Sequence, residues 1–288
     1  MKSPFFSAVA VMAVVALGSL GFSQSDKAAA AKPQIGLQLY SLRDALKTDV
    51  PGTLDKVKAL GIEEVELANV GGLMTPEGKK LLDARGLKPI GGHWPFERLD
   101  SEPEKVAEEA KALGCSYVAC AWIPHSGAIF TEADARKAIA VFNKAGEACK
   151  AQGLRFCYHI HGYEFHPYKD GTLFDLLAEG MKPGVADFEM DVFWVVHPGQ
   201  DPVALLKKYP DRFVLMHLKD KQKGTRHDLT GHAPNEQSVP LGTGMVDWPA
   251  LLAEAKKAGV KHYFIEDEAP AVEDQLPVTI KFLKTQGF

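Results

Sequence analysis

Residues 58–67, KALGIEEVEL, run from a helical segment through one glycine into an apolar strand. Glycine enters the left-handed conformation at a helix end without steric cost, so Gly61 predicts a helix stop followed directly by a strand. The same unit recurs four more times, as DARGLKPIGG (83–92), KALGCSYVAC (111–120), KAQGLRFCYH (150–159) and KKAGVKHYFIE (256–266). Parallel strands need crossover connections, which are usually helices, so this repeat predicts a parallel α/β fold.

Eight apolar runs are candidate strands of this fold, at residues 35–40, 64–68, 88–93, 117–122, 155–161, 185–192, 213–218 and 263–267. Amphipathic helical stretches lie between them, and capping-box patterns at Ser101 and Thr131 and the Asp49 before Pro51 predict helix starts. No Ser-, Gly- or Pro-rich linker divides residues 32–288, which have the length of one eight-fold barrel of about 250 residues. We therefore predict a single-domain (β/α)8 TIM barrel over residues 32–288.

The first 31 residues have the pattern of a secretory signal peptide with a short leader. A basic start at Lys2 precedes an almost wholly apolar run over residues 5–22 and small residues at 28–31. We expect cleavage between about Gln24 and Pro33, export to the periplasm or the extracellular space, and no stable membrane insertion afterwards. An uncleaved membrane anchor is the alternative, since the run is close to the shortest span.

Composition narrows the possible partners. The net charge of −4 and a pI near 6.2 show no basic excess, which argues against nucleic acid and favours a small-molecule partner. Cys120 and Cys157 lie within apolar runs and are expected to be buried thiols, whereas Cys115 and Cys149 pair only if the fold brings them together. The long polar, glycine-rich stretch 221–248 is expected to be either a lid over the barrel mouth or a disordered surface loop.

The four last predicted strands each end in metal-ligating or acid–base residues. The fifth ends at His159 and His161, the sixth at Asp191, the seventh at His217 and Lys219, and the eighth at Glu266. In a closed barrel the carboxyl ends of the strands converge on one cup, where active sites lie. Two imidazoles and two carboxylates there could enclose one divalent cation, and mixed N and O ligands favour Mn²⁺, Fe²⁺, Co²⁺ or Zn²⁺.

Other polar and aromatic residues near the strand ends are candidates for substrate binding. Glu66 and His93 end the second and third strands, and Trp122 and Trp194 could stack on sugar faces. A buried ion pair for Glu66 and core packing for the two tryptophans are the structural alternatives. His197 is expected near the mouth because of its short distance from Asp191 along the chain.

Several motifs resemble one family over residues 34–285. They are QLYSLRD (38–44), VELAN (65–69), YHIHGYEF (158–165), the DVFWVVHPGQDP run from Asp191, HLKD (217–220) and LGTGMVDW (241–248). The chain resembles the xylose isomerase-like TIM barrel superfamily, which includes sugar phosphate isomerases/epimerases, ketose 3-epimerases, inosose dehydratase and endonuclease IV. The resemblance implies a metal site on strands five to eight, with Asp191, His217 and Glu266 as three of its ligands.

The first ligand position departs from the epimerase pattern of that family. It falls on His159 instead of a glutamate, and Glu164 is the alternative ligand. The resemblance implies a metal-dependent isomerase or epimerase that abstracts a proton beside a carbonyl of a keto-sugar or related polyol. Glu266, His159, Lys219 and His161 are its candidate catalytic residues.

An asymmetric pair of bases instead suits β-elimination, so a 3-keto-glycoside lyase is the second reading. A non-catalytic carbohydrate-binding barrel is the third. The acidic pI and the export signal disfavour a DNA-repair nuclease.

Overall fold

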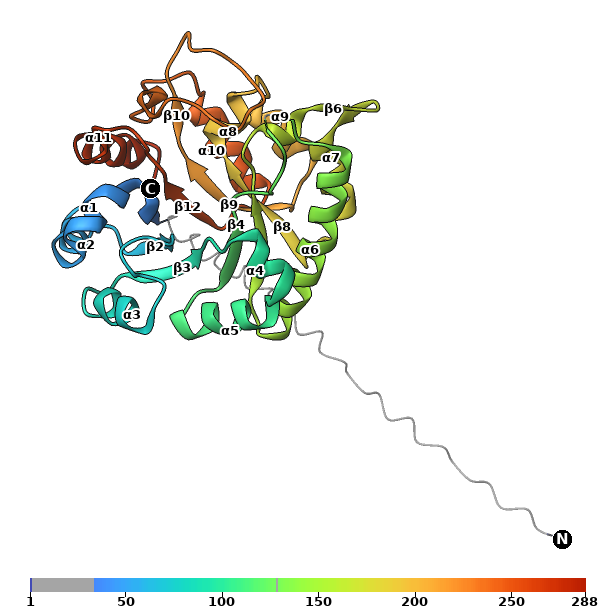
Figure 1. Ribbon diagram of the computed structural model, residues 1–288, viewed down its shortest axis with the longest axis horizontal. Helices are drawn as coiled ribbons and strands as arrows, with labels where there is room; N and C mark the ends of the chain where they lie inside the picture. The colour runs from blue at the N-terminus through green and yellow to red at the C-terminus, as the bar shows by residue number, and fades with distance from the viewer. Residues whose placement is uncertain (2–33, 128) are drawn as a thin grey trace. The chain divides into compact units, whose positions relative to one another are not determined.

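The computed structural model describes Met1, residues 34–127 and residues 129–288 (Figure 1). The predicted signal peptide and its cleavage point lie outside these described residues. Within them, no helix has the length and apolar character needed to cross a membrane.

Eight parallel strands form the sheet expected of a TIM barrel, in the spatial order β3-β2-β1-β12-β9-β8-β5-β4. They are β1 (Ile35–Gln38), β2 (Glu64–Leu67), β3 (Lys88–Gly92), β4 (Tyr117–Cys120), β5 (Arg155–His159), β8 (Ala186–Asp191), β9 (Phe213–Leu218) and β12 (His262–Ile265). Between β3 and β4 the barrel is closed by a His93–Ala119 bridge and by the bonds Ser116 N to Ile90 O (2.8 Å) and Trp94 N to Ala119 O (2.9 Å). All eight sequence-predicted strands are present.

Helices surround the strands, as Figure 1 shows. They are α1 (Arg43–Thr48), α2 (Val50–Ala59), α3 (Pro76–Asp83), α4 (Phe96–Ser101), α5 (Pro103–Leu113), α6 (Glu132–Ala151), α7 (Leu173–Gly180), α8 (Val192–Val196), α9 (Pro202–Lys208), α10 (Trp248–Lys257) and α11 (Val272–Thr285). The five repeated glycines have φ between 64° and 86°, so each occupies the left-handed region that stops its helix, as predicted.

Two of the three predicted helix starts are confirmed and one is wrong. Asp49 caps α2, and Thr131 forms a capping box with Asp134 at the start of α6. The prediction at Ser101 is wrong, because Ser101 ends α4 and its hydroxyl donates to Glu97 O (2.7 Å), while Glu102 occupies the N-cap of α5.

Alternate residues of each strand point into the barrel and form two layers of different chemistry. An apolar layer contains Ile90, Tyr117, Cys157, Leu215 and Phe264. His159, His217 and Glu266 each follow one of these residues by two positions. Because side chains alternate with a period of two along a strand, they also point into the barrel. The ionisable residues therefore lie together on the side where the strands end.

All four cysteines are buried and free, so Cys115 and Cys149 do not pair.

The stretch that follows β9 is ordered around two short paired strands, β10 (Asp220–Lys221) and β11 (Ser238–Val239). The buried carboxylate of Asp220 accepts hydrogen bonds from Gly242 N (3.0 Å), Gly244 N (3.1 Å) and Trp248 Nε1 (2.8 Å). The stretch is thus tied to the barrel at both of its ends.

Candidate metal centre

Strand register brings the expected ligands together. His159 on β5 is paired with Glu189 on β8, and Asp191 on β8 is paired with His217 on β9. Glu266 directly follows β12, the next strand of the sheet. Neighbouring parallel strands therefore present these side chains at one level of the barrel.

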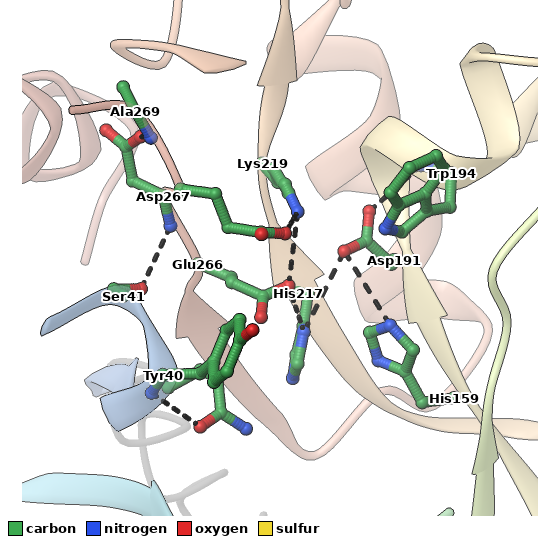
Figure 2. Close-up of polar contacts among 12 residues, drawn as sticks. Tyr40, Ser41, His159, Asp191, Trp194, His217, Lys219, Glu266, Asp267 and Ala269 are labelled. Carbon is green, nitrogen blue, oxygen red and sulfur yellow. Dashed lines mark hydrogen bonds and ion pairs between the residues drawn. The ribbon is translucent and has the colours of Figure 1, made fainter. Parts of the chain in front are cut away.

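One atom from each of four residues faces a common point. Asp191 Oδ2 lies 3.9 Å from both His159 Nε2 and His217 Nδ1, and His217 Nδ1 lies 3.2 Å from Glu266 Oε2 (Figure 2). The four atoms all lie within 4.8 Å of one another, and all four residues are buried. Two ligands bound at about 2.1 Å to a tetrahedral ion are about 3.4 Å apart, so this spacing suits a divalent cation.

The surroundings of Asp191 also fit a cation. Its Oδ2 atom is buried and has no hydrogen-bond partner among the described residues. Burial and the nearby Glu266 charge raise the pKa of Asp191 to about 8, because its negative charge is poorly compensated. Two nitrogen and two oxygen donors form the set that Mn²⁺, Fe²⁺, Co²⁺ and Zn²⁺ prefer.

Glu189 also belongs to this cluster and is not among the site residues expected from the sequence. Glu189 is two residues before Asp191 on β8, so strand alternation places both side chains inside the barrel. This alternation is the sequence pattern from which the position of Glu189 could be predicted. Glu189 Oε2 lies 3.0 Å from His93 Nε2 and 3.3 Å from His159 Nδ1. His93, His159, Glu189 and His217 form a second set whose donor atoms lie close together.

Glu66 is fully buried beneath the cluster. Its Oε2 atom lies 2.6 Å from His217 Nε2 and accepts a hydrogen bond from Gln38 Nε2 (2.7 Å). The structure therefore corrects the expectation of substrate contact, because the accessible face of the site does not include Glu66. The alternative of a buried ion pair describes this residue better.

Glu164, the alternative first ligand, points elsewhere. It is fully buried, accepts hydrogen bonds from His161 N (2.9 Å) and from the Tyr158 hydroxyl, and belongs to neither ligand set. Tyr158 alternates with His159 along β5 and stacks on Phe142 of α6, on the outer side of the barrel. Burial raises the pKa of Glu164 to about 7. The geometry thus favours His159 over Glu164.

A cavity of about 570 Å³ opens above the cluster. His159 and Glu266 line it together with His93, His161, Trp122 and Trp194. Trp194 stacks on His161 with ring centroids 4.4 Å apart, and Gly231 and His232 of the stretch after β9 complete the wall. That stretch therefore covers part of the barrel mouth.

Lys219 stands beside Glu266 without lining the cavity. Its Nζ atom lies 3.5 Å from Glu266 Oε2 and is paired with the Glu268 carboxylate. Burial opposes its charge, but Glu266 and Glu268 outweigh this effect and raise the pKa of Lys219. Lys219 is therefore a fixed cation next to Glu266.

His197 is not at the mouth. It is 2% exposed, is absent from the residues that line the cavity, and its Nε2 lies 3.2 Å from Asp228 Oδ1. Asp191 caps α8 by accepting from Trp194 N (3.0 Å), and this short helix carries His197 away from the cluster. The expectation of substrate contact at His197 is thus corrected.

Comparisons with known proteins agree with this architecture. A family model described as xylose isomerase-like TIM barrel matches residues 54–286. The inosose dehydratase of Geobacillus kaustophilus (strain HTA426) is 27% identical over 144 residues, which span 45% of this chain and 44% of that protein, less than half of each.

Solved structures resemble most of the chain. A sugar phosphate isomerase/epimerase from Parabacteroides distasonis ATCC 8503 is 28% identical, with a TM-score of 0.72 over 88% of this chain and 98% of that one. The IOLI protein, crystallised with a bound zinc atom, has a TM-score of 0.66 over 88% and 96% of the two chains. Its 15% identity shows a shared fold alone.

Proposed function

Because this chain belongs to the xylose isomerase-like TIM barrel family, we propose that it is a metal-dependent enzyme that removes a proton from a carbon beside a carbonyl group of a carbohydrate. Relatives named dehydratase and isomerase/epimerase support a sugar-modifying enzyme. His159, Asp191, His217 and Glu266 would hold the cation. When bound, it would polarise the substrate carbonyl and acidify the neighbouring C–H.

The position and charge of Glu266 carry this proposal. It is the only carboxylate among the four candidate ligands that lines the cavity. Burial alone would favour its neutral form, but the charge of Lys219 opposes burial most strongly, and the pKa of Glu266 lies well below its usual range. Glu266 is therefore ionised at neutral pH and available as a general base.

The lining of the cavity favours an uncharged substrate. Among the described residues it contains Glu97, Glu266 and Glu268 but neither Lys nor Arg. The cationic side chain in this lining is His93: burial opposes its charge, but Glu66 and Glu189 outweigh burial and raise the pKa of His93 to about 10. Its Nε2 atom is already paired with these two buried carboxylates, so a phosphate group would meet mainly carboxylates of its own sign. Trp122 and Trp194 offer aromatic faces suited to the apolar faces of a sugar ring.

One observation favours elimination as the outcome of proton removal. Two strands separate β5 from β12, and the β5 side of the cavity presents His159 and His161 rather than a second carboxylate. Burial holds the pKa of His161 well below its usual value, so its imidazole is neutral and can hydrogen-bond a departing oxygen. A 3-keto-glycoside lyase is therefore our second candidate beside an isomerase or epimerase.

Proton NMR of the Mn²⁺- or Co²⁺-loaded protein, incubated with a 3-keto-glycoside in D₂O, would test both. Deuterium beside the carbonyl without release of the aglycone supports isomerisation, and stoichiometric release of the aglycone supports elimination. The Asp191→Ala chain under the same conditions is the metal-free control. If the 3-keto-glycoside binds but neither exchanges a proton for deuterium nor releases its aglycone, the protein would be a non-catalytic carbohydrate-binding barrel.

We further propose that the protein acts outside the cytoplasm, on the basis of its signal-like first 31 residues. N-terminal sequencing of the exported protein should find a start between about Gln24 and Pro33. Retention of Met1 would contradict cleavage.

A further inference from the structure

The two histidines of the cluster use opposite ring nitrogens. His159 directs Nε2 toward Asp191 Oδ2 (3.9 Å) and Nδ1 toward Glu189 Oε2 (3.3 Å). His217 directs Nδ1 toward Asp191 Oδ2 (3.9 Å) and Glu266 Oε2 (3.2 Å). Its Nε2 atom faces Glu66 Oε2 (2.6 Å) and, at a longer distance, Glu189 Oε1 (3.2 Å). Each imidazole thus has one nitrogen at the cation position and the other on a buried carboxylate.

An ionised carboxylate only accepts hydrogen bonds, so the ring nitrogen that faces it carries the proton. A neutral imidazole has a single N–H, which leaves the lone pair on the other nitrogen free to bind a metal. Glu66 therefore selects the Nε2–H form of His217, with Nδ1 as the ligand. Glu189 selects the Nδ1–H form of His159, with Nε2 as the ligand.

We propose that Glu66 and Glu189 are positioning residues that fix opposite tautomers of His217 and His159 and thereby set the affinity of the metal site. The inference rests on the metal dependence of the proposed function. It assigns a purpose to two buried carboxylates that have no route to the substrate.

Further contacts hold both carboxylates in place. Gln38 Nε2 donates to Glu66 Oε2 (2.7 Å), and His93 Nε2 lies 3.0 Å from Glu189 Oε2 and 3.4 Å from Glu66 Oε1. Both glutamates are fully buried. The nitrogens that face them are already at hydrogen-bond distance, which leaves no space for a cation between them without displacement.

The chain provides a matched control on the same strand. Glu64 precedes Glu66 by two residues on β2, so both side chains point into the barrel, and Glu64 Oε2 lies 2.9 Å from His262 Nδ1. His262 begins β12, at the end of the barrel opposite Glu266, and belongs to neither ligand set. Glu64→Gln therefore alters the same kind of glutamate–histidine pair away from the cation.

The first test is the dissociation constant for Co²⁺ alone, measured by calorimetry with the full chain. Loss of such outer partners typically weakens metal affinity by about 10- to 100-fold, which we expect for Glu66→Gln and Glu189→Gln, with Glu64→Gln unchanged. The d–d absorption of bound Co²⁺ should shift in the first two variants only. Equal affinity and an identical spectrum in the wild type and Glu66→Gln would overturn the proposal. If Glu66→Gln does not fold, Gln38→Met, which frees Glu66 to rotate, should weaken Co²⁺ binding in the same direction.

The second test reads the tautomers directly. Long-range ¹H–¹⁵N NMR of the Zn²⁺-loaded chain should show His159 bound through Nε2 and His217 through Nδ1. The same ligating nitrogen in both rings, or two Zn²⁺ ions per chain with one on Glu189, would refute it. Both tests measure binding, so a chain that binds metal as described but transforms no sugar would contradict the proposed function and leave this inference standing. A wild type that binds no divalent cation would overturn both.

Discussion

Replacing Asp220 by alanine should strongly destabilise the protein. Its two carboxylate oxygens accept from five donors, and three of them, Lys221 N, Gly244 N and Trp248 Nε1, are in buried hydrogen bonds. Each buried donor left without a partner costs about 1–3 kcal/mol, so the three together predict a loss of about 3–9 kcal/mol. Gly242 N and Val246 N are only partly buried and can be solvated after the substitution, so they add little.

Equilibrium urea unfolding, followed by circular dichroism, would measure this loss. Asp247→Ala is the matched control, because Asp247 caps α10 through one exposed bond to Ala250 N (3.2 Å) and should cost about 1 kcal/mol. Asp220→Asn should be nearly as damaging as Asp220→Ala if its amide nitrogen faces those donors. The reasoning fails if Asp220→Ala destabilises the chain no more than Asp247→Ala does.

Three further predictions concern the site and its surroundings. The Asp191→Ala variant should contain no bound metal when measured by elemental analysis. Its circular dichroism spectrum should stay unchanged, because a residue at a strand tip contributes little to the core. Stoichiometric metal in this variant would refute the assignment of Asp191 as a ligand. Glu266→Gln should lower kcat by about 10²- to 10⁴-fold, the usual contribution of a general base, and near-normal turnover would exclude that role. Burial raises the pKa of Glu164 from 4.5 to about 7, so the folded chain keeps a proton that the unfolded chain releases, and stability should fall as pH rises through this window. Glu164→Gln should remove this dependence, worth about 3 kcal/mol, and a wild type whose unfolding free energy does not vary there would contradict it.

Much of the barrel was predictable because its signals are local. The stretch 213–218 matches β9 at both ends, since an apolar run bounded by polar residues specifies a buried strand. The predicted fifth strand is two residues too long, because β5 stops at His159 and His161 turns to line the cavity. The helix start at Ser101 was wrong because the short helix α4, which precedes it, had no clear periodic signal.

The site was partly predictable for the same reason. His159, Asp191, His217 and Glu266 stand at strand ends, where the barrel fold itself makes them converge. The partners of Glu66 and His197 could not be inferred, since each depends on a contact with a residue distant in the chain, His217 and Asp228 respectively. The position of Glu189 could have been predicted from the sequence, because strand alternation places it on the same inward face of β8 as Asp191.

The apolar layer beneath the ionisable residues gives the barrel a blind end. Phe264 and Leu215 occupy its interior, so a molecule that reacts beside Glu266 must arrive and depart on the side of Gly231 and His232. An isomerase takes in one substrate molecule and releases one product molecule through such an opening. A lyase makes two products that leave by the same exit, so its catalytic cycle would have a fixed order of departure, and the fragment nearer the opening would go first.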